Sequence, residues 1–94
     1  MVFEWDDNKN AANIVNHGLD FDTASLVFGD DNRIVKYDEK HSLYEERYIT
    51  IGSINGLITV LMVVYTENDD VIRIISARPA NQKEKNQYYG RKRR

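Results

Sequence analysis

The sequence predicts an α+β protein in which N-terminal helices pack on a mostly antiparallel sheet that is followed by a C-terminal helix. Residues 6–29 hold two helix signals, each opened by an aspartate and closed by a glycine. Runs rich in β-branched residues then follow one another between residues 45 and 78, with only short turns between them. Short turns join antiparallel strands, because parallel neighbours need a long crossover.

The composition is that of a single soluble domain spanning residues 1–94. The chain has 94 residues, of which 41% are hydrophobic and 30% are charged, enough for one modest core. It has no cysteine, which excludes disulfides and thiolate metal sites. The longest apolar run, residues 57–65, is too short to cross a bilayer, and no signal peptide precedes Phe3. We therefore expect a cytoplasmic protein with no membrane contact.

Charge is unevenly distributed along the chain. A net charge of −2 argues against a protein that coats nucleic acid, which would be strongly basic. Acidic residues gather in the first half, whereas residues 91–94 read Arg-Lys-Arg-Arg. This basic end is expected to be a disordered, solvated tail. A local basic site elsewhere on the folded domain remains a possible interpretation.

The first elements are predicted to be a strand over Val2–Trp5 and a helix over residues 7–17. Asp6 or Asp7 is a good N-cap for this helix, and Gly18 is suited to end it. The apolar side of the helix is predicted to consist of Ala11, Ile14 and Val15. The spacing i, i+4, i+8 gathers three polar residues on one face: Lys9, Asn13 and His17.

A second helix is predicted to begin after Asp20 and to end at Gly29. Its apolar residues recur at helical spacing as Phe21, Ala24 and Phe28. The next segments are expected to be a turn, a strand and a polar loop, over residues 30–32, 33–37 and 38–44.

The rest of the sheet is expected to consist of strands over residues 45–54, 57–66 and 71–78. Asn55-Gly56 joins the first two and is the strongest short hairpin signal, because a type I′ turn needs two residues with positive φ. The second strand is apolar on both faces, so it should be central and covered. A turn at Asn68-Asp69 leads to the third strand, and Pro79 suits the first position of a polar helix that runs to about Tyr89.

The centres of the turns predict how the strands pair. A first turn centred at residues 55 and 56 puts Arg47 opposite Val64, and a second centred at residues 68 and 69 puts Val64 opposite Arg73. Opposed residues point to the same face, so both arginines flank Val64 on one face. Arg78 is expected on the other face. A single bulge would reverse this parity.

Two arginines on one sheet face indicate a site for a phosphate-bearing ligand, because guanidinium groups match phosphate oxygens. Cleavage of RNA by its own 2′-hydroxyl needs a base, an acid and cations around the phosphorane. His17 is the candidate acid or base, since histidine titrates near neutral pH, and the candidate cations are Lys9, Arg47 and Arg73. His17 and His41 are far apart in sequence and lack a carboxylate at motif spacing, so no metal or other cofactor is predicted.

Each of these residues also has a purely structural interpretation. A histidine near a helix C-terminus commonly interacts with the helix dipole, and a helical lysine is usually only solvated. Arg47 and Arg73 could pair with carboxylates in a structural network, for which the candidates are Glu45, Glu46 and Glu84. The aromatic residues expected in the core, rather than as platforms for stacking bases, are Trp5, Tyr48 and Tyr65.

Ordered motifs run across nearly the whole chain. The opening Phe3-Glu4-Trp5-Asp6 is followed by Lys9, Asn13, Asn16-His17-Gly18, Phe21, Ala24 and Phe28. A middle motif reads Glu45-Glu46-Arg47-Tyr48 with Ile51-Gly52. The closing motif is Arg-Ile-Ile-Ser-Ala-Arg at residues 73–78, followed by Ala80, Glu84 and Tyr88. Together these motifs resemble those of the BrnT toxin family.

This resemblance implies a bacterial type II toxin–antitoxin ribonuclease with a RelE-like fold. Such toxins cleave RNA without a metal, inhibit translation and are held inactive by a BrnA-type antitoxin, which resembles ribbon-helix-helix DNA-binding proteins. Operator DNA is then bound only through the antitoxin complex. The polar motif positions fall at Lys9, His17, Glu45, Arg47, Arg73 and Arg78. Our hypothesis assigns catalysis to Lys9, His17, Arg47 and Arg73, and substrate binding to Glu45 and Arg78.

The chain departs from the family pattern at Asn16, Tyr44 and Pro79, where relatives usually carry Lys, Gly and often a basic residue. The alternative hypothesis is a RelE-like module that has lost catalysis and acts with its antitoxin in operon control. A purely structural domain would be supported if Arg47 and Arg73 were fully buried in salt bridges. Direct DNA binding by this chain alone is disfavoured by its acidic balance.

Overall fold

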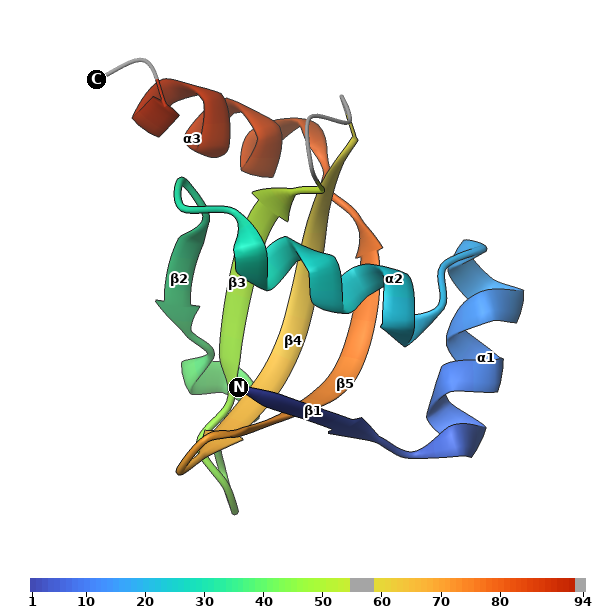
Figure 1. The fold of residues 1–94 in the computed structure, drawn as a ribbon. Helices are drawn as coiled ribbons and strands as arrows, with labels where there is room; N and C mark the ends of the chain where they lie inside the picture. The colour runs from blue at the N-terminus through green and yellow to red at the C-terminus, as the bar shows by residue number, and fades with distance from the viewer. Residues whose placement is uncertain (55–58, 93–94) are drawn as a thin grey trace.

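The chain folds as the α+β protein that the sequence predicts (Figure 1). The structure, a computed structural model, describes residues 1–54 and 59–92. Within these residues one five-stranded sheet has the order β1-β5-β4-β3-β2, in which only the β1–β5 pair is parallel. The elements in chain order are β1 (Val2–Trp5), α1 (Asp7–His17), α2 (Phe21–Ser25), the 3-10 helix η1 (Leu26–Gly29), β2 (Ile34–Tyr37), the 3-10 helix η2 (Glu39–His41), β3 (Tyr48–Ser53), β4 (Val60–Asn68), β5 (Val71–Pro79) and α3 (Gln82–Lys92).

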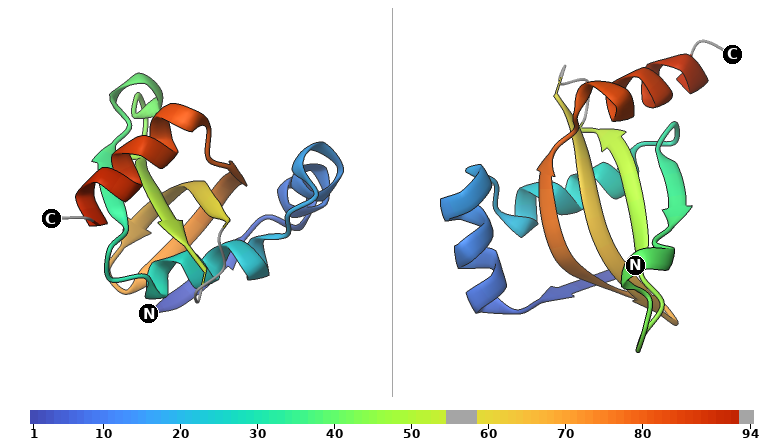
Figure 2. Two further views of the ribbon diagram at one scale, coloured as in Figure 1. Left: turned by 90° about the horizontal axis from the view of Figure 1, so that it is seen from above. Right: turned by 180° about the vertical axis from the view of Figure 1, so that it is seen from behind.

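The sheet has a layer of core on each face. α2 and η1 cross one face, and α3 lies across one end of the opposite face (Figures 1 and 2). The first layer includes Phe21, Val27, Val63, Tyr65 and Ile74, with Trp5 and Tyr48 packed against it. The second layer includes Ile51, Val60, Met62 and Tyr88. β4 is therefore the central strand, as predicted, and it has buried residues on both faces, although α3 covers only one end of the second face (Figure 2).

The first helix begins and ends where its capping residues predict. Asp6 accepts hydrogen bonds from the backbone N–H groups of Asn8 at 2.8 Å and Lys9 at 3.0 Å. Gly18 adopts a φ of 66°, a left-handed conformation that costs glycine little, and its N–H donates to the carbonyl of Ile14 at 2.8 Å. These local contacts account for both boundaries of α1.

The prediction that Ala11, Ile14 and Val15 form the buried side of α1 is wrong. Ile14 and Val15 are 46% and 84% exposed, whereas Asn13 is only 6% exposed. The Asn13 side chain donates to the carbonyl of Ala77 at 2.8 Å and accepts from the N–H of Ala77 at 3.1 Å. Because β1 pairs with β5 only as far as Ile74, Asn13 continues the pairing along the free edge of β5. A strand edge needs a donor and an acceptor, so a polar residue is buried here.

A β-bulge in β5 changes which residues share a face of the sheet. Ile75 has no partner of its own in β4, because the pairs on either side of it are Tyr65–Ile74 and Val64–Ser76. A bulge adds one residue to a strand and so reverses the alternation of side chains beyond it. Arg73 and Arg78 therefore share a face, and the prediction that Arg78 lies on the other face is wrong.

The prediction that Val64 separates Arg47 from Arg73 is wrong by two residues. β4 pairs Thr66 with Arg73. The β3–β4 register, continued by one residue beyond the start of β3, puts Arg47 opposite Thr66. The backbones of the two arginines are therefore two strand spacings apart, about 10 Å, with Thr66 between them.

Several element boundaries also differ from the predicted ones. β3 begins at Tyr48, so residues 45–47 belong to the preceding loop, and the second turn lies at residues 69–70. Pro79 ends β5 instead of opening a helix, and α3 runs from Gln82 to Lys92, beyond the predicted end at Tyr89 and into the predicted tail. The predicted turn at Asn55-Gly56 lies outside the described residues.

Two sets of hydrogen bonds hold α3 in place. Asn81 and Glu84 form a reciprocal cap, in which the side chain of each residue accepts a hydrogen bond from the backbone N–H of the other residue, both at 2.8 Å. Further along α3, the hydroxyl of Tyr88 donates to Asp30 at 2.6 Å, and the Ser53 N–H donates to the same carboxylate at 2.9 Å. Burial acts to raise the pKa of Asp30, but these donors hold it below its ordinary value.

Gly52 in β3 is a position where the fold leaves little room for a side chain. A Cβ atom there would lie 3.0 Å from Val27 Cγ1 and 3.0 Å from Arg33 Cβ. We expect Gly52→Ala to lower the free energy of unfolding by about 1–3 kcal/mol through overpacking, as measured by urea denaturation. Gly90→Ala in α3 is the control, because its Cβ position has open space and alanine favours a helix. Equal stability of the two variants would contradict this account.

Candidate active site

The face of the sheet on the α3 side is covered by α3 at one end only (Figure 2, right). We call the remainder the open face, because no other α-helix of the described chain crosses it. Its strand residues, placed by the register, are Lys36, Ile49, Val64, Thr66, Arg73, Ser76 and Arg78.

Arg73 presents an accessible guanidinium group on the open face. Its side chain is 44% exposed, and its Nη1 lies 3.5 Å from Oε1 of Glu4, which is its neighbour in the parallel β1–β5 pair. An ion pair of this length between exposed groups contributes little to stability. The guanidinium is therefore able to bind another anion.

Arg47 is held by its backbone more than by its side chain. Its carbonyl accepts from the Asp38 N–H at 2.9 Å, and its N–H donates to Ser42 Oγ at 2.9 Å. The side chain is 29% exposed and lies 3.8 Å from Glu45, and its buried Nε has no hydrogen-bond partner among the described residues. Within residues 1–54 and 59–92 the guanidinium has one long ion pair and is not enclosed in a salt-bridge network, which is the arrangement that would have supported a purely structural role.

Arg78 is bound much more tightly than the other two arginines. Its Nη1 and Nη2 donate to the two carboxylate oxygens of Glu84 at 2.8 and 3.0 Å, and Nη1 also donates to the Pro79 carbonyl at 3.1 Å. Burial acts to raise the pKa of Glu84, but the hydrogen bonds from Arg78 and the Asn81 backbone hold it below its ordinary value. This bidentate pair fastens the start of α3 to β5.

The lowered pKa of Glu84 predicts a loss of stability in acid. Because the pKa is lower in the folded chain than in the unfolded chain, the pair stabilises the fold above the unfolded pKa and ceases to do so as the pH falls through the folded value. We expect Glu84→Gln to be less stable than the wild type at neutral pH, with a shallower loss of unfolding free energy below about pH 4. Urea denaturation at each pH gives the unfolding free energy of wild type and variant as a function of pH. The same pH dependence for both proteins would contradict the prediction.

Lys9 and His17 lie on the side of α1 that faces the edge of β5. Each is one helical turn from Asn13, which binds Ala77, and both are exposed. α1 and β5 run in the same direction (Figure 1), so His17, the last residue of α1, lies toward the Pro79 end of β5 and Lys9 toward its start. The predicted site residues thus form two groups, with Glu45, Arg47 and Arg73 at one end of the sheet and His17 and Arg78 toward the other.

Comparison with known proteins now decides the family. A model of the BrnT family, the ribonuclease toxins of type II toxin-antitoxin systems, matches residues 5–84. The chain belongs to the BrnT family. The match includes every residue assigned above to catalysis or substrate binding. No curated protein is similar enough to this chain to be matched.

This BrnT structure contains one pair of residues that sequence reasoning missed. Nδ1 of His41 lies 3.0 and 3.3 Å from the two carboxylate oxygens of Asp38. The histidine side chain is 58% exposed, whereas the aspartate side chain is 9% exposed. The spacing Asp-x-x-His in a polar loop was a usable signal, but His41 was considered only as a metal ligand.

Over residues 1–54 and 59–92, no three His, Asp or Glu side chains are grouped so that they could hold a metal ion. Over the same residues, no helix is both long enough and apolar enough to span a membrane.

Proposed function

We propose that this BrnT protein is an endoribonuclease that cleaves RNA without a metal ion, at a site centred on Arg47 and Arg73. The observation that carries the proposal is that Arg73 pairs with Thr66 and the continued β3–β4 register puts Arg47 on the other side of Thr66. Among the described residues, each of these arginines has only a long ion pair. Their guanidinium groups would bind the phosphate oxygens and stabilise the negative charge that the phosphorane gains. Only RNA has a 2′-hydroxyl beside its phosphate, so RNA is the substrate.

The remaining motif residues are proposed to act around this centre. Lys9 would supply a third cation, and His17 would act as an acid or base. Glu45 would accept hydrogen bonds from nucleotide N–H groups beside Arg47. Arg78 would bind a further phosphate from the α3 end of the open face, in competition with Glu84.

We further propose that a BrnA-type, ribbon-helix-helix antitoxin neutralises the toxin in the cytoplasm. Membership of a toxin–antitoxin family supports the existence of an antitoxin partner. Inhibition of translation follows if the RNA that is cleaved is messenger RNA. Binding of operator DNA would then belong to the complex, since the chain itself has a net charge of −2.

The test is cleavage of a mixed-sequence RNA in excess EDTA. Attack by the 2′-hydroxyl leaves a 2′,3′-cyclic phosphate and a 5′-hydroxyl, and a single 2′-deoxynucleotide at the cleaved position blocks it. We expect the wild type to give these products and to be blocked by the 2′-deoxynucleotide. If free RNA is not cut, we expect the same reaction on ribosome-bound RNA. Cleavage that appears only when Mg²⁺ is added would overturn metal independence.

One observation favours the alternative function, a partner-binding module without catalysis. Each arginine of the site has a carboxylate neighbour, and these are Glu45, Glu4 and Glu84. If the ion pairs are structural, the wild type cuts neither free nor ribosome-bound RNA, and antitoxin binding survives replacement of Arg73. Cleavage by the wild type rejects this alternative.

A further inference from the structure

We infer that His41, oriented by Asp38, is the general base of the RNA cleavage proposed above, and this inference rests on that proposed function. The Asp38 carboxylate lies 3.0 Å from Nδ1 of His41, so Nδ1 carries a proton and Nε2 is the nitrogen free to accept one. The aspartate is buried and the imidazole is 58% exposed. A buried carboxylate that fixes the tautomer of an accessible histidine is the arrangement that base catalysis requires.

The same contacts tie this histidine to the arginine of the site. The Asp38 N–H donates to the Arg47 carbonyl at 2.9 Å. Ser42 Oγ donates to the Asp38 carbonyl at 2.5 Å and accepts from the Arg47 N–H at 2.9 Å. The turn that carries His41 is therefore held by hydrogen bonds to the backbone of Arg47.

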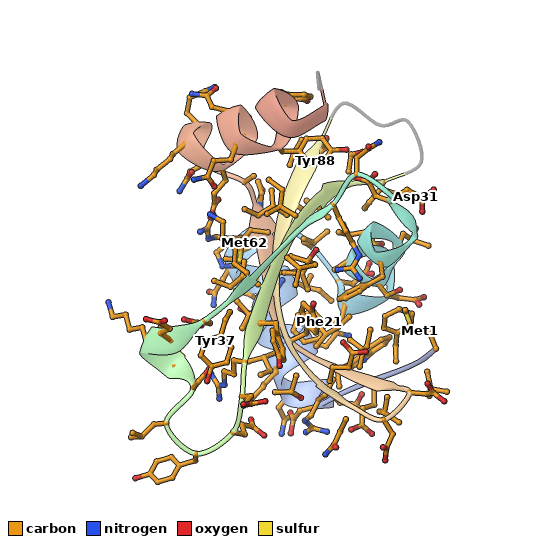
Figure 3. The ribbon with its side chains drawn as sticks, turned by 90° about the vertical axis from the view of Figure 1, so that its left-hand side faces the viewer. Met1, Phe21, Asp31, Tyr37, Met62 and Tyr88 are labelled. Atoms are coloured by element: carbon orange, nitrogen blue, oxygen red, sulfur yellow. The ribbon has the colours of Figure 1, made fainter. Side chains whose placement is uncertain are left out.

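His41 also lies at the end of the sheet that carries Arg47 and Arg73. η2, which ends at His41, follows directly after Tyr37 and lies on the side of the sheet that carries Met62, away from Phe21 (Figure 3). This is the open face, at the end where Arg47 and Arg73 flank Thr66. His17, the other histidine of the chain, is on α1 and lies toward the opposite end of β5 (Figure 1).

The proposed step needs only the RNA, His41 and water. Neutral His41 takes the 2′-hydroxyl proton on Nε2 while the 2′-oxygen forms a bond to phosphorus. The P–O5′ bond breaks, and its electron pair leaves on the 5′-oxygen, which takes a proton from water. The imidazolium is stabilised by Asp38 and then returns its proton to the solvent.

The electrostatic field at His41 is set by the charged groups along its loop. These groups are Asp38, Glu39, Lys40, Glu45, Glu46 and Arg47.

The experiment compares His41→Gln with Lys83→Ala, a variant of an exposed residue of α3, in the EDTA cleavage assay across pH 5 to 9. We expect His41→Gln to lower kcat by about 100-fold or more and to remove the acid limb of the pH–rate profile, whereas Lys83→Ala stays within about threefold of the wild type. Asp38→Asn should also lower kcat, because a carboxamide no longer fixes the His41 tautomer that leaves Nε2 unprotonated. Imidazole added to His41→Ala should restore part of the rate, which a residue of purely structural importance would not allow.

The outcomes separate this inference from the proposed function. If the wild type cleaves RNA, Arg73→Ala does not, and His41→Gln retains full activity, the proposed function stands and the assignment of His41 is overturned. His41→Gln could lose activity because it does not fold, which circular dichroism would show. In that case His41→Ala is tested, and if it is folded but imidazole does not restore its activity, the assignment of His41 is overturned. No cleavage by the wild type on any RNA overturns both.

Discussion

Arg73→Ala is expected to lower the rate of RNA cleavage by about 100-fold or more, the usual effect of removing one group that stabilises charge in a transition state. The loss should appear mainly in kcat, because the charge on the phosphoryl oxygens grows as the 2′-oxygen attacks. Stability should change by less than about 0.5 kcal/mol, since the side chain is 44% exposed and its ion pair is long. Initial rates in EDTA and urea denaturation measure the two effects.

Two variants serve as controls for the loss of Arg73. Glu4→Gln removes the carboxylate neighbour and leaves the cation, so cleavage should be unchanged or faster. Lys83→Ala removes a positive charge from an exposed residue of α3, outside the open face, and should have no effect beyond a weak change in RNA affinity. Equal cleavage by wild type and Arg73→Ala would either remove Arg73 from the site or expose a contaminating nuclease.

Asn13→Ala is expected to lower the free energy of unfolding by about 3 kcal/mol or more. The substitution leaves three backbone groups without their partner, namely the N–H and carbonyl of Ala77 and the carbonyl of Leu19, and each such buried group costs about 1–3 kcal/mol. For a domain of this size the melting temperature should fall by more than about 10 °C. Thermal and urea denaturation both measure the effect.

Val15→Ala in the same helix is the matched comparison. Val15 is a large apolar residue, but its side chain is mostly exposed, so its replacement should change stability by less than about 0.5 kcal/mol. A stability loss for Val15→Ala as large as that for Asn13→Ala would show that the apolar side of α1 is buried after all. Asn13 would then not be the residue that anchors the helix.

Signals that act within a few residues were sufficient to predict the elements themselves. Asp6 and Gly18 determine where α1 begins and ends because their partners are amides and carbonyls of the same turn. The apolar run of β4 predicts a central strand because both of its faces carry buried residues. The predicted turn centres also put Arg47 and Arg73 on one face, because the observed registers differ from the predicted ones by two residues and side chains alternate with a period of two.

The tertiary structure decided the features whose partners are distant in sequence. Asn13 is buried because Ala77, a residue 64 positions away, has a free strand edge to satisfy, and no helical periodicity reports such an edge. The bulge at Ile75 moves Arg78 to the face of Arg73, and the sequence around it carries no turn residue that marks the extra position. Glu84 then engages that arginine, so only the fold shows which arginines stay available to bind a phosphate.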